Sequence, residues 1–284
     1  MAVTEVTTKG ELVTSEFIPD LWSLKVQSFL EDAFVIVPLV DHTYEPDLTY
    51  GITLHIPNYV EITAVSVASP GAEITPLEAE GGVLEITVDK WFEAPISYSE
   101  FSRVQNRPDF LEKASKGSAY AVAKQIDKSL ADEFKNFQSG NKQGTAGNTV
   151  TDDLLIDCME ILDEYSVRQE DRVIVGDPSM KADLMRIDKF IRNDYGKGNV
   201  VASGKFGDIY NCSVWITNNL EAISPGSYAA MFQKEALAII MQKQISVSAF
   251  DMPQNHMHLI MVQAIWGTAE MRDRAGVAFF TRKS

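Results

Sequence analysis

Residues 106–140 read NRPDFLEKASKGSAYAVAKQIDKSLADEFKNFQSG and carry the longest helical pattern in the chain. Pro108 stands in the first turn of the predicted helix, and Gly140 follows its predicted end. Between them, apolar residues recur at spacings of three and four over about 30 residues. A helix of that length spans about 45 Å. The pattern therefore favours an extended, slab-like molecule over a compact globule.

The segment before this helix has the alternating pattern of β-strands. Apolar and polar residues alternate from Tyr50 to Val67 and again from Val83 to Ile96, and the turn between them is predicted at residues 69–71. These features predict a long two-stranded hairpin with no other strand or helix close in sequence. Because an isolated two-stranded ribbon is marginal in water, we expect it to lie against another molecule.

The first 47 residues are too short for a domain, and we interpret them as an arm. Pro19 opens a short amphipathic helix, whose apolar residues are Leu21, Trp22, Val26, Phe29, Leu30 and Ala33. The following residues 34–40 are predicted to be extended and are interrupted by Pro38.

The part after the long helix begins with a polar stretch rich in glycine and asparagine, residues 138–149, which predicts a domain boundary. A compact α/β unit follows, with helices predicted at 152–165 and 178–193, a strand at 172–175, and Asp177 as the cap of the second helix. Residues 195–207 contain several glycines and are predicted to form a loop. Strands are then predicted at 209–217, 228–232, 236–250, 258–269 and 276–282.

The composition is that of a folded protein, with 45% hydrophobic and 23% charged residues in a chain of 284. The longest apolar stretches, 33–40 and 257–266, are far shorter than the 18 or so residues that a membrane span needs, so we expect no membrane partner. Cys158 and Cys212 are too few for a disulfide framework, which indicates a reducing compartment. Both fall in apolar surroundings and are interpreted as buried side chains rather than nucleophiles.

The net charge of −15 lies almost wholly in the first hundred residues, which hold seventeen acidic residues against Lys9, Lys25 and Lys90. Such a protein is not expected to bind nucleic acid through its overall charge, because phosphate contacts need clustered lysine and arginine. The acidic charges of this segment repel one another, and this repulsion would be reduced if the segment lay on a basic surface.

No arrangement of residues points to catalysis. Gly176-Asp177-Pro178 lies at a strand-to-helix junction, where α/β folds bind phosphates, but the chain has no GxGxxG and no P-loop. His256 and His258 share one side of a predicted strand, yet nothing completes a metal site. We therefore predict that the protein is not an enzyme and that it uses no cofactor or metal.

The order of these parts resembles that of tailed-bacteriophage major capsid proteins with the Hong Kong 97-type fold. The similarity runs over essentially the whole chain, and it depends on the order and spacing of several stretches rather than on one motif. These stretches are SEFIPDLW (15–22), GITLHIP (51–57), LEITVDKW (84–91), AKQID (123–127) and RVIVGDP (172–178).

The resemblance implies an α+β, Hong Kong 97-like capsid fold with an N-terminal arm (1–47) and an extended β-hairpin loop (48–98). A long spine helix and a peripheral domain would comprise 99–144 together with 256–284. An axial domain (145–255) would carry a flexible loop (195–207) near the symmetry axes. The glycine and lysine residues of that axial loop are Gly196, Lys197, Gly198, Gly204 and Lys205.

The implied function is that of a structural subunit of an icosahedral phage shell. The subunit would assemble with itself into pentamers and hexamers that enclose double-stranded DNA without sequence-specific binding. A separate scaffolding protein and a portal are the other implied partners, and the chain would be made in the bacterial host cytoplasm and end in the virion. Some relatives lock the shell by a covalent lysine-to-asparagine bond from the hairpin. Because no lysine lies between Lys25 and Lys90, we expect noncovalent contacts here.

We further hypothesise an electrostatic joint between subunits, in which acidic residues of the hairpin meet basic residues near the start of a neighbour's spine helix. The acidic group is Glu61, Glu73, Glu78, Glu80 and Glu85, and the basic group is Arg103, Arg107, Lys113 and Lys116. Each exposed pair stabilises by only about 0 to 1 kcal/mol, so shape and apolar burial must carry most of the binding.

Two alternatives to a virus shell stay open. One is an encapsulin-like bacterial compartment, whose shell loads proteins in place of a genome. The other is a cytosolic α/β ligand-binding enzyme that uses the Asp177 junction.

Overall fold

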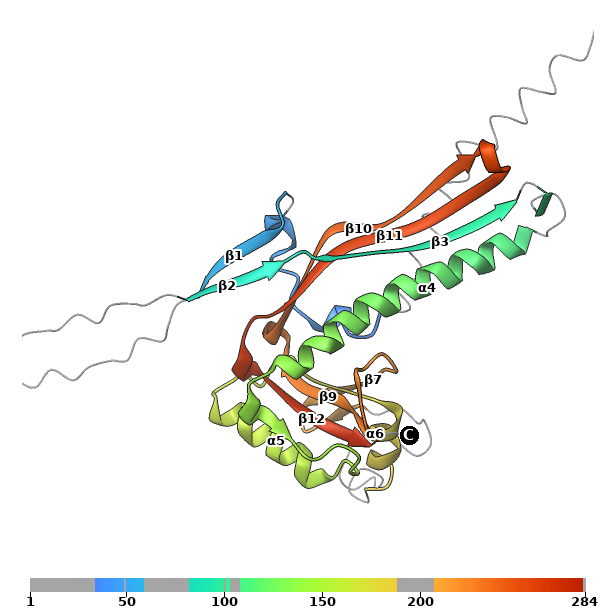
Figure 1. Ribbon diagram of the computed structural model, residues 1–284. Coiled ribbons are helices and arrows are strands. Elements are labelled where there is room, and N and C mark those ends of the chain that lie inside the picture. The colour runs from blue at the N-terminus through green and yellow to red at the C-terminus, as the bar shows by residue number, and fades with distance from the viewer. Residues whose placement is uncertain are drawn as a thin grey trace, which may run out of the picture.

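The computed structural model describes residues 34–48, 50–58, 82–99, 101–102, 108–187 and 207–282. They form an elongated part, in which strands run along one long helix, and a compact part at one end of it (Figure 1). The predicted helix at 19–33, the predicted hairpin tip at 59–81 and the glycine loop at 195–206 lie outside these residues. No helix within the described ranges has the length and apolar character needed to cross a membrane.

Helix α4 (Pro108–Asp132) confirms the long predicted helix, and a 3-10 turn (Glu133–Asn136) continues it. The predicted spacing of three and four produces one continuous buried face. Its buried members are Ala119, Val122, Ala123, Ile126, Leu130, Phe134 and Phe137.

A three-stranded antiparallel sheet lies along α4, in the order β10 (Leu237–Met252), β11 (Met257–Glu270) and β3 (Lys90–Ser99). Alternate residues of each strand face the helix, so that Val262, Ala264 and Trp266 are fully buried against it. We call this sheet together with α4 the slab. It joins residues 90–99 to residues 257–266, which are far apart in the sequence.

A seven-stranded sheet forms the compact part. Its order is β4 (Lys142–Gln143), β12 (Gly276–Arg282), β9 (Gly226–Gln233), β5 (Arg172–Gly176), β7 (Cys212–Ile216) and β6 (Asp208–Ile209), with β8 (Ala222–Ile223) beside β9. Helices α5 (Asp152–Glu164) and α6 (Pro178–Leu184) cover the face that carries Ile174. The opposite face, with Val173 and Val175, packs against the end of α4. This alternation explains why all five residues of β5 are buried.

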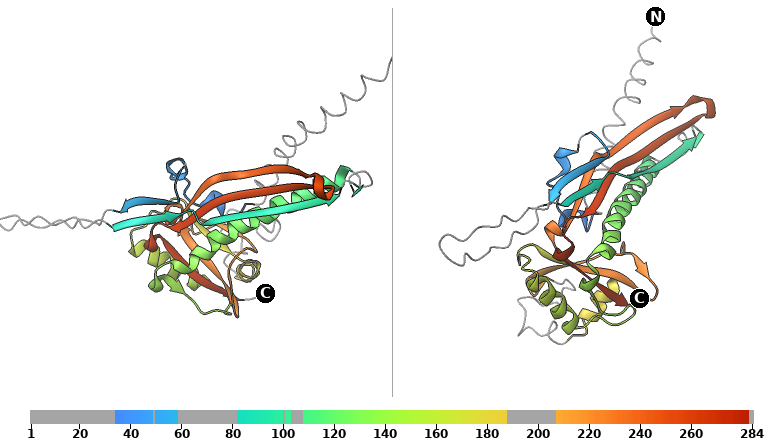
Figure 2. Two further views of the ribbon diagram at one scale, coloured as in Figure 1. Left: turned by 45° about the horizontal axis from the view of Figure 1, so that its top comes forward. Right: turned by 60° about the vertical axis from the view of Figure 1, so that its left-hand side comes forward.

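Strands β1 (Thr53–Asn58) and β2 (Gly82–Thr87) pair antiparallel and confirm the base of the predicted hairpin. The prediction that its return strand continues to Ile96 is wrong, because residues 90–99 form β3 and pair with β11. We call β1 and β2 the ribbon. Their apolar side packs with Ala238 and Ile240 of β10, which alternate with the residues facing α4. The ribbon base is therefore attached to the slab on the sheet face away from the helix, and its strands project beyond the slab (Figure 2).

Gly267 of β11 allows the close approach between the slab and the ribbon base. A Cβ atom at this position would lie 2.4 Å from the backbone oxygen of Thr87. No side chain fits there, so only glycine lets the two backbones lie together.

Residues 34–40 are not extended as predicted, because Pro38 starts a 3-10 turn (Val37–Leu39). The carboxylate of Asp127, fully buried in α4, accepts the backbone amides of Val35 at 3.0 Å and Ile36 at 3.3 Å. Burial raises the pKa of Asp127, and these hydrogen bonds oppose that shift. The contact fixes the start of the described chain on the last third of the helix.

Two predicted elements of the compact part differ from the structure. The strand predicted at 209–217 is a hairpin, since Tyr210 and Asn211 have φ of 52° and 63° and form the turn between β6 and β7. The helix predicted at 178–193 ends at Leu184. There the amides of Arg186 and Ile187 bond only three residues back, which tightens the chain into a turn.

The division into arm, hairpin loop, peripheral domain and axial domain stays a prediction. The last strands are divided between two sheets. Strand β10 pairs with β11 in the slab, whereas β12 lies beside β9 in the compact part. The polar stretch 138–149, predicted as a linker, also supplies β4, the parallel partner of β12.

Candidate functional site

The ribbon and the residues just before it present large apolar side chains to solvent. Tyr50 is 91% exposed, and Ile52 and Val83 are also exposed. Glu85, a predicted contact residue, lies with an oxygen 3.2 Å from Nδ1 of His55 on the paired strand, and both side chains are largely exposed. Apolar groups on a projecting ribbon gain free energy when another surface covers them. The ribbon therefore has the character of a binding element.

The structure places few of the predicted contact residues. Lys116 is exposed on α4, whereas Glu61, Glu73, Glu78, Glu80, Arg103, Arg107 and the side chain of Lys113 lie outside what is described. The same holds for the axial loop residues Gly196, Lys197, Gly198, Gly204 and Lys205. Figures 1 and 2 show the ribbon at one end of the slab and the start of α4 at the other. Glu85 and Lys116 of one chain are therefore not brought together.

The slab has a second exposed apolar surface, on the sheet face away from α4. Trp91 is 65% exposed, and Phe250 and Met252 are exposed as well. Trp91 pairs with Ile265 and Phe250 with Leu259 across neighbouring strands, so these side chains share one face. This surface was not predicted from the sequence. The signal for it was Trp91, a large aromatic residue at an odd position of a strand whose apolar residues fall mostly at even positions.

A groove of about 1030 Å³ separates the ribbon from the edge of the compact part. Its walls come from residues 41–44 of the arm, from Ile56 and Leu84 of the ribbon, and from residues 233–235 and 271–274. Both signs of charge line it, and Arg272 pairs with Glu235 at 2.8 Å. Such a mixed and open surface suits contact with a protein segment better than capture of a small molecule.

The Asp177 junction was the candidate ligand site of the enzyme alternative, and its polar groups bond to one another. The Asp177 carboxylate accepts the amide of Met180 at 2.9 Å, which confirms it as the cap of α6. The Ser179 hydroxyl lies 2.8 Å from both Asp177 oxygens and 2.6 Å from the backbone oxygen of Arg282. The junction therefore joins α6 to β12.

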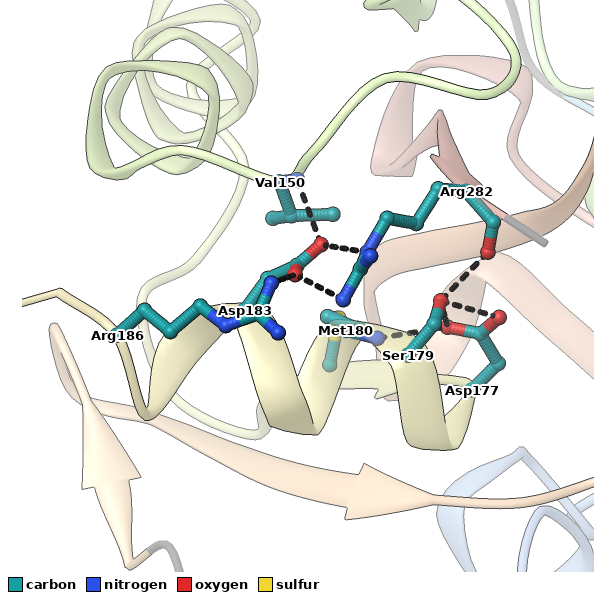
Figure 3. Close-up of polar contacts among 7 residues, drawn as sticks. All are labelled: Val150, Asp177, Ser179, Met180, Asp183, Arg186 and Arg282. Carbon is teal, nitrogen blue, oxygen red and sulfur yellow. Dashed lines mark hydrogen bonds and ion pairs between the residues drawn. The ribbon is translucent and has the colours of Figure 1, made fainter. Parts of the chain in front are cut away.

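Asp183 completes this network at the centre of Figure 3. Its side chain is fully buried, and its oxygens lie 2.8 and 3.0 Å from the Arg282 guanidinium and 3.3 Å from the amide of Val150. Arg186 approaches it at 3.4 Å from the solvent side. A buried carboxylate with this set of donors is satisfied by the protein itself, so the arrangement holds three segments together.

His256 and His258 do not lie together on one side of a strand. His256 adopts a left-handed conformation in the turn between β10 and β11, whereas Nδ1 of His258 lies 2.5 Å from Asp251 and its ring stacks on Tyr98. Among the described residues, no group of three or more His, Cys, Asp or Glu side chains could hold a metal ion.

Both cysteines are buried, as predicted. Burial raises the pKa of Cys158 to about 12 and also raises the pKa of Cys212. Because the thiolate is the reactive form, these side chains are inert packing groups in the folded protein.

The chain is similar to known proteins in its structure. The chain matches no protein-family profile and no curated protein sequence. A chain from a structure of Mycobacterium phage Che8 is 20% identical, with a TM-score of 0.75 over 87% of this chain and 90% of that one. A chain of the capsid structure of Cyanophage P-SCSP1u is 15% identical, with a TM-score of 0.67 over 83% and 85% of the two chains.

A crystal structure of a virus-like particle from Pyrococcus furiosus is similar as well. Its chain is 9% identical, with a TM-score of 0.63 over 92% of this chain and 98% of that one. The predicted α+β fold class is confirmed, and the chain shares its fold with these phage and particle chains over nearly their full length.

Proposed function

We propose that this chain, which has the fold of tailed-phage capsid proteins, is the structural subunit of an icosahedral phage shell. The observation that supports this most is the structural match to the Che8 chain and the cyanophage capsid chain, each over at least 83% of this chain. The proposed assembly consists of pentamers and hexamers that enclose double-stranded DNA. The subunit would be made in the bacterial cytoplasm, would use a scaffolding protein and a portal, and would end in the virion.

The exposed surfaces of the single chain support self-assembly. The ribbon and the residues just before it expose Val83, Tyr50 and Ile52, and the outer slab face exposes Trp91 and Phe250. Apolar patches of this kind are stabilised when a second copy covers them. A shell of pentamers and hexamers would give all copies similar neighbours, so the same two surfaces can be covered throughout.

The proposed joint between neighbours uses the acidic hairpin and the basic start of the spine helix. Glu85 belongs to the ribbon, and Lys116 belongs to the first half of α4, whose start lies at the other end of the slab (Figure 1). These groups are therefore proposed to meet between two copies. In the proposal, Glu61, Glu73, Glu78 and Glu80 extend the acidic side, and Arg103, Arg107 and Lys113 extend the basic side. Glycine and lysine residues of the loop 195–207 would surround the symmetry axes.

Electron microscopy of the purified protein, with its sedimentation profile, tests the function. Closed shells, rings or irregular polymers of one repeating unit are expected. A monomer or dimer that stays small at high concentration and with scaffold supplied would contradict the proposal. Nucleic acid in shells isolated from cells is expected for a virus, whereas a single enriched protein cargo would favour the compartment alternative.

The joint has a separate test in the pair Glu78→Lys and Glu80→Lys. If the acidic hairpin binds a basic surface, the double variant assembles less well than wild type, and the difference shrinks as salt screens the charges. Equal assembly across a salt titration would refute the joint while leaving the shell function intact.

A further inference from the structure

Within the described residues, three stretches of chain connect the slab to the compact part. Residues 133–141 continue α4 into β4, residues 234–236 lead from β9 into β10, and residues 271–275 lead from β11 into β12 (Figure 1). The last two stretches lie side by side, because the amide of Met271 donates to the backbone oxygen of Ala236 at 2.8 Å. We call these three stretches the junction.

Glu270 is the last residue of β11, at the point where this strand enters the junction. Its Oε1 atom is buried, and it accepts no hydrogen bond from the part of the chain that the structure describes. The nearby Glu133, by contrast, accepts the hydroxyl of Thr268 at 2.7 Å and the side-chain amide of Asn136 at 2.6 Å. A buried carboxyl oxygen without a donor disfavours the ionised form. Glu270 is therefore held in a site that suits its neutral form.

The charged groups that act on Glu270 come from three different elements. Glu133, just after α4, and Asp273, just after β11, repel its ionised form, whereas Lys142 of β4 attracts it. Burial, together with these two carboxylates, raises the pKa of Glu270 to about 7. Protonation of this one carboxyl group therefore changes the charge of the place where the two parts of the molecule meet.

Other charged side chains at the junction have partners of their own. They are Lys90 of β3, which lies 3.5 Å from Glu133, Arg272, which lies 2.8 Å from Glu235, and Arg274, which lies over the ring of Tyr165. Lys234 is exposed to solvent. Lys142 is thus the cation that compensates an ionised Glu270.

We propose that Glu270 is a proton switch that sets how tightly the slab and the compact part are held together. With a proton on Glu270, the junction closes around a neutral carboxyl group. Without the proton, repulsion from Glu133 and Asp273 drives the carboxylate toward water, and the connections at 234–236 and 271–275 loosen. The switch belongs to the single subunit and does not depend on the proposed function.

The closed junction is favoured at low pH. The pKa of Glu270 is about 7 in the closed state and returns toward its ordinary value of 4.5 once the carboxyl group meets water. The closed state therefore binds the proton more tightly than the loosened state. The ratio of loosened to closed subunits should rise with pH, by up to about tenfold per pH unit between these two values.

Distances between two spin labels on unassembled subunits test the switch. Lys124→Cys on α4 and Glu160→Cys on α5 carry the labels, because both positions are exposed and belong to different parts of the molecule. Cys158 and Cys212 are buried and give little background. We expect a narrow distance distribution at pH 5.5 and a broader one, with a longer component, at pH 8. Identical distributions at the two pH values would overturn the proposal.

Glu270→Gln removes the titrating group and nearly keeps its size. This variant should give the pH 5.5 distribution at both pH values. The matched control Glu164→Gln, on the exposed face of α5, should change with pH as the wild type does. A Glu270→Gln subunit that still changes with pH would show that another group, such as a histidine, titrates, and the proposal would be wrong.

Two further variants distinguish a proton switch from a purely structural role. Asp273→Asn removes a carboxylate that repels Glu270, so the total rise in the loosened fraction with pH should become smaller. Lys142→Gln removes the compensating cation, so the rise should become larger. Changes in the same direction, or no change in either variant, would contradict the proposal. These two variants also report on the switch if Glu270→Gln fails to fold.

Discussion

The indole N–H of Trp266 donates to the hydroxyl of Ser129 at 2.8 Å, and this bond joins β11 to α4 inside the slab. Both residues are buried, and the Ser129 hydroxyl in turn donates to backbone oxygens one turn earlier in the helix. The hydroxyl thus accepts from the sheet and donates to the helix. Every donor in this group is used, as the low dielectric of a core requires.

Ser129→Ala should lower the free energy of unfolding by about 1 to 3 kcal/mol, because it leaves the Trp266 N–H buried without an acceptor. Trp266→Phe removes that donor but opens a cavity. In the double variant no N–H is left without an acceptor, so its loss in the free energy of unfolding should be smaller than the sum of the two single losses. Denaturant unfolding measures all three losses. Strict additivity would show that the bond contributes nothing.

Arg282→Gln should destabilise the compact part by about 3 kcal/mol, since it leaves the fully buried Asp183 carboxylate without its guanidinium. Arg186→Gln is the matched control, because the Arg186 side chain is 66% exposed and approaches the same carboxylate only at 3.4 Å. The control should cost no more than about 1 kcal/mol. Thermal unfolding of both variants measures the difference, and similar losses would contradict the assignment of the network.

Glu270 should make stability depend on pH. Burial raises the pKa of this carboxyl to about 7, Asp273 and Glu133 add to the shift, and Lys142 opposes it. A raised carboxyl pKa means that the folded state binds the proton more tightly than the unfolded state. The stabilisation is therefore complete below the unfolded value near 4.5 and is lost as pH rises through about 7.

Unfolding in denaturant at pH 5.5 and pH 8 checks this expectation. Glu270→Gln should be more stable than wild type at pH 8, by about 1 to 2 kcal/mol after allowance for partial exposure, and should lose part of the pH dependence. Glu164→Gln, on the exposed face of α5, is the control and should leave the pH dependence unchanged. A wild-type stability that rises between the two pH values would disprove the assignment.

Gly267→Ala should detach the ribbon base from the slab, because the new Cβ would meet the Thr87 backbone at 2.4 Å. We expect a loss of about 1 to 3 kcal/mol and faster amide exchange in β1 and β2. Gly117→Ala is a suitable control, since nothing lies within 4 Å of its added Cβ and alanine favours a helix by about 1 kcal/mol. Equal stability of the two variants would argue against the close contact.

The elements that the sequence predicts well are those with local causes. Residues close together in the sequence determine three features that the structure confirms. These are the apolar spacing of α4, the Asp177 cap of α6 and the alternation in β1 and β2. The turn at Tyr210 and Asn211 was missed because neither residue is glycine. The early end of α6 was missed because it follows from backbone bonds of Arg186 and Ile187 rather than from a breaking residue.

The candidate contact surfaces depend on long-range packing and were predicted only in outline. The hairpin pattern indicated a ribbon without a local partner, but not that Gly267 would hold its base on β11. The pairing of Trp91 with Ile265 places an exposed aromatic on the outer slab face, and it joins two residues that are 174 positions apart in the sequence. Alternation within one strand says which residues share a face, but not which neighbour covers it.

The central place of β12 in the compact part has a consequence for how the subunit is made. This strand consists of residues 276–282, yet it lies between β4 and β9 rather than at an edge. Neither the sheet nor the Arg282 contact with Asp183 can be completed until that stretch has left the ribosome. A chain that stops before residue 276 therefore lacks an interior strand and cannot complete the sheet. Such incomplete copies are kept out of an assembly that needs many identical subunits.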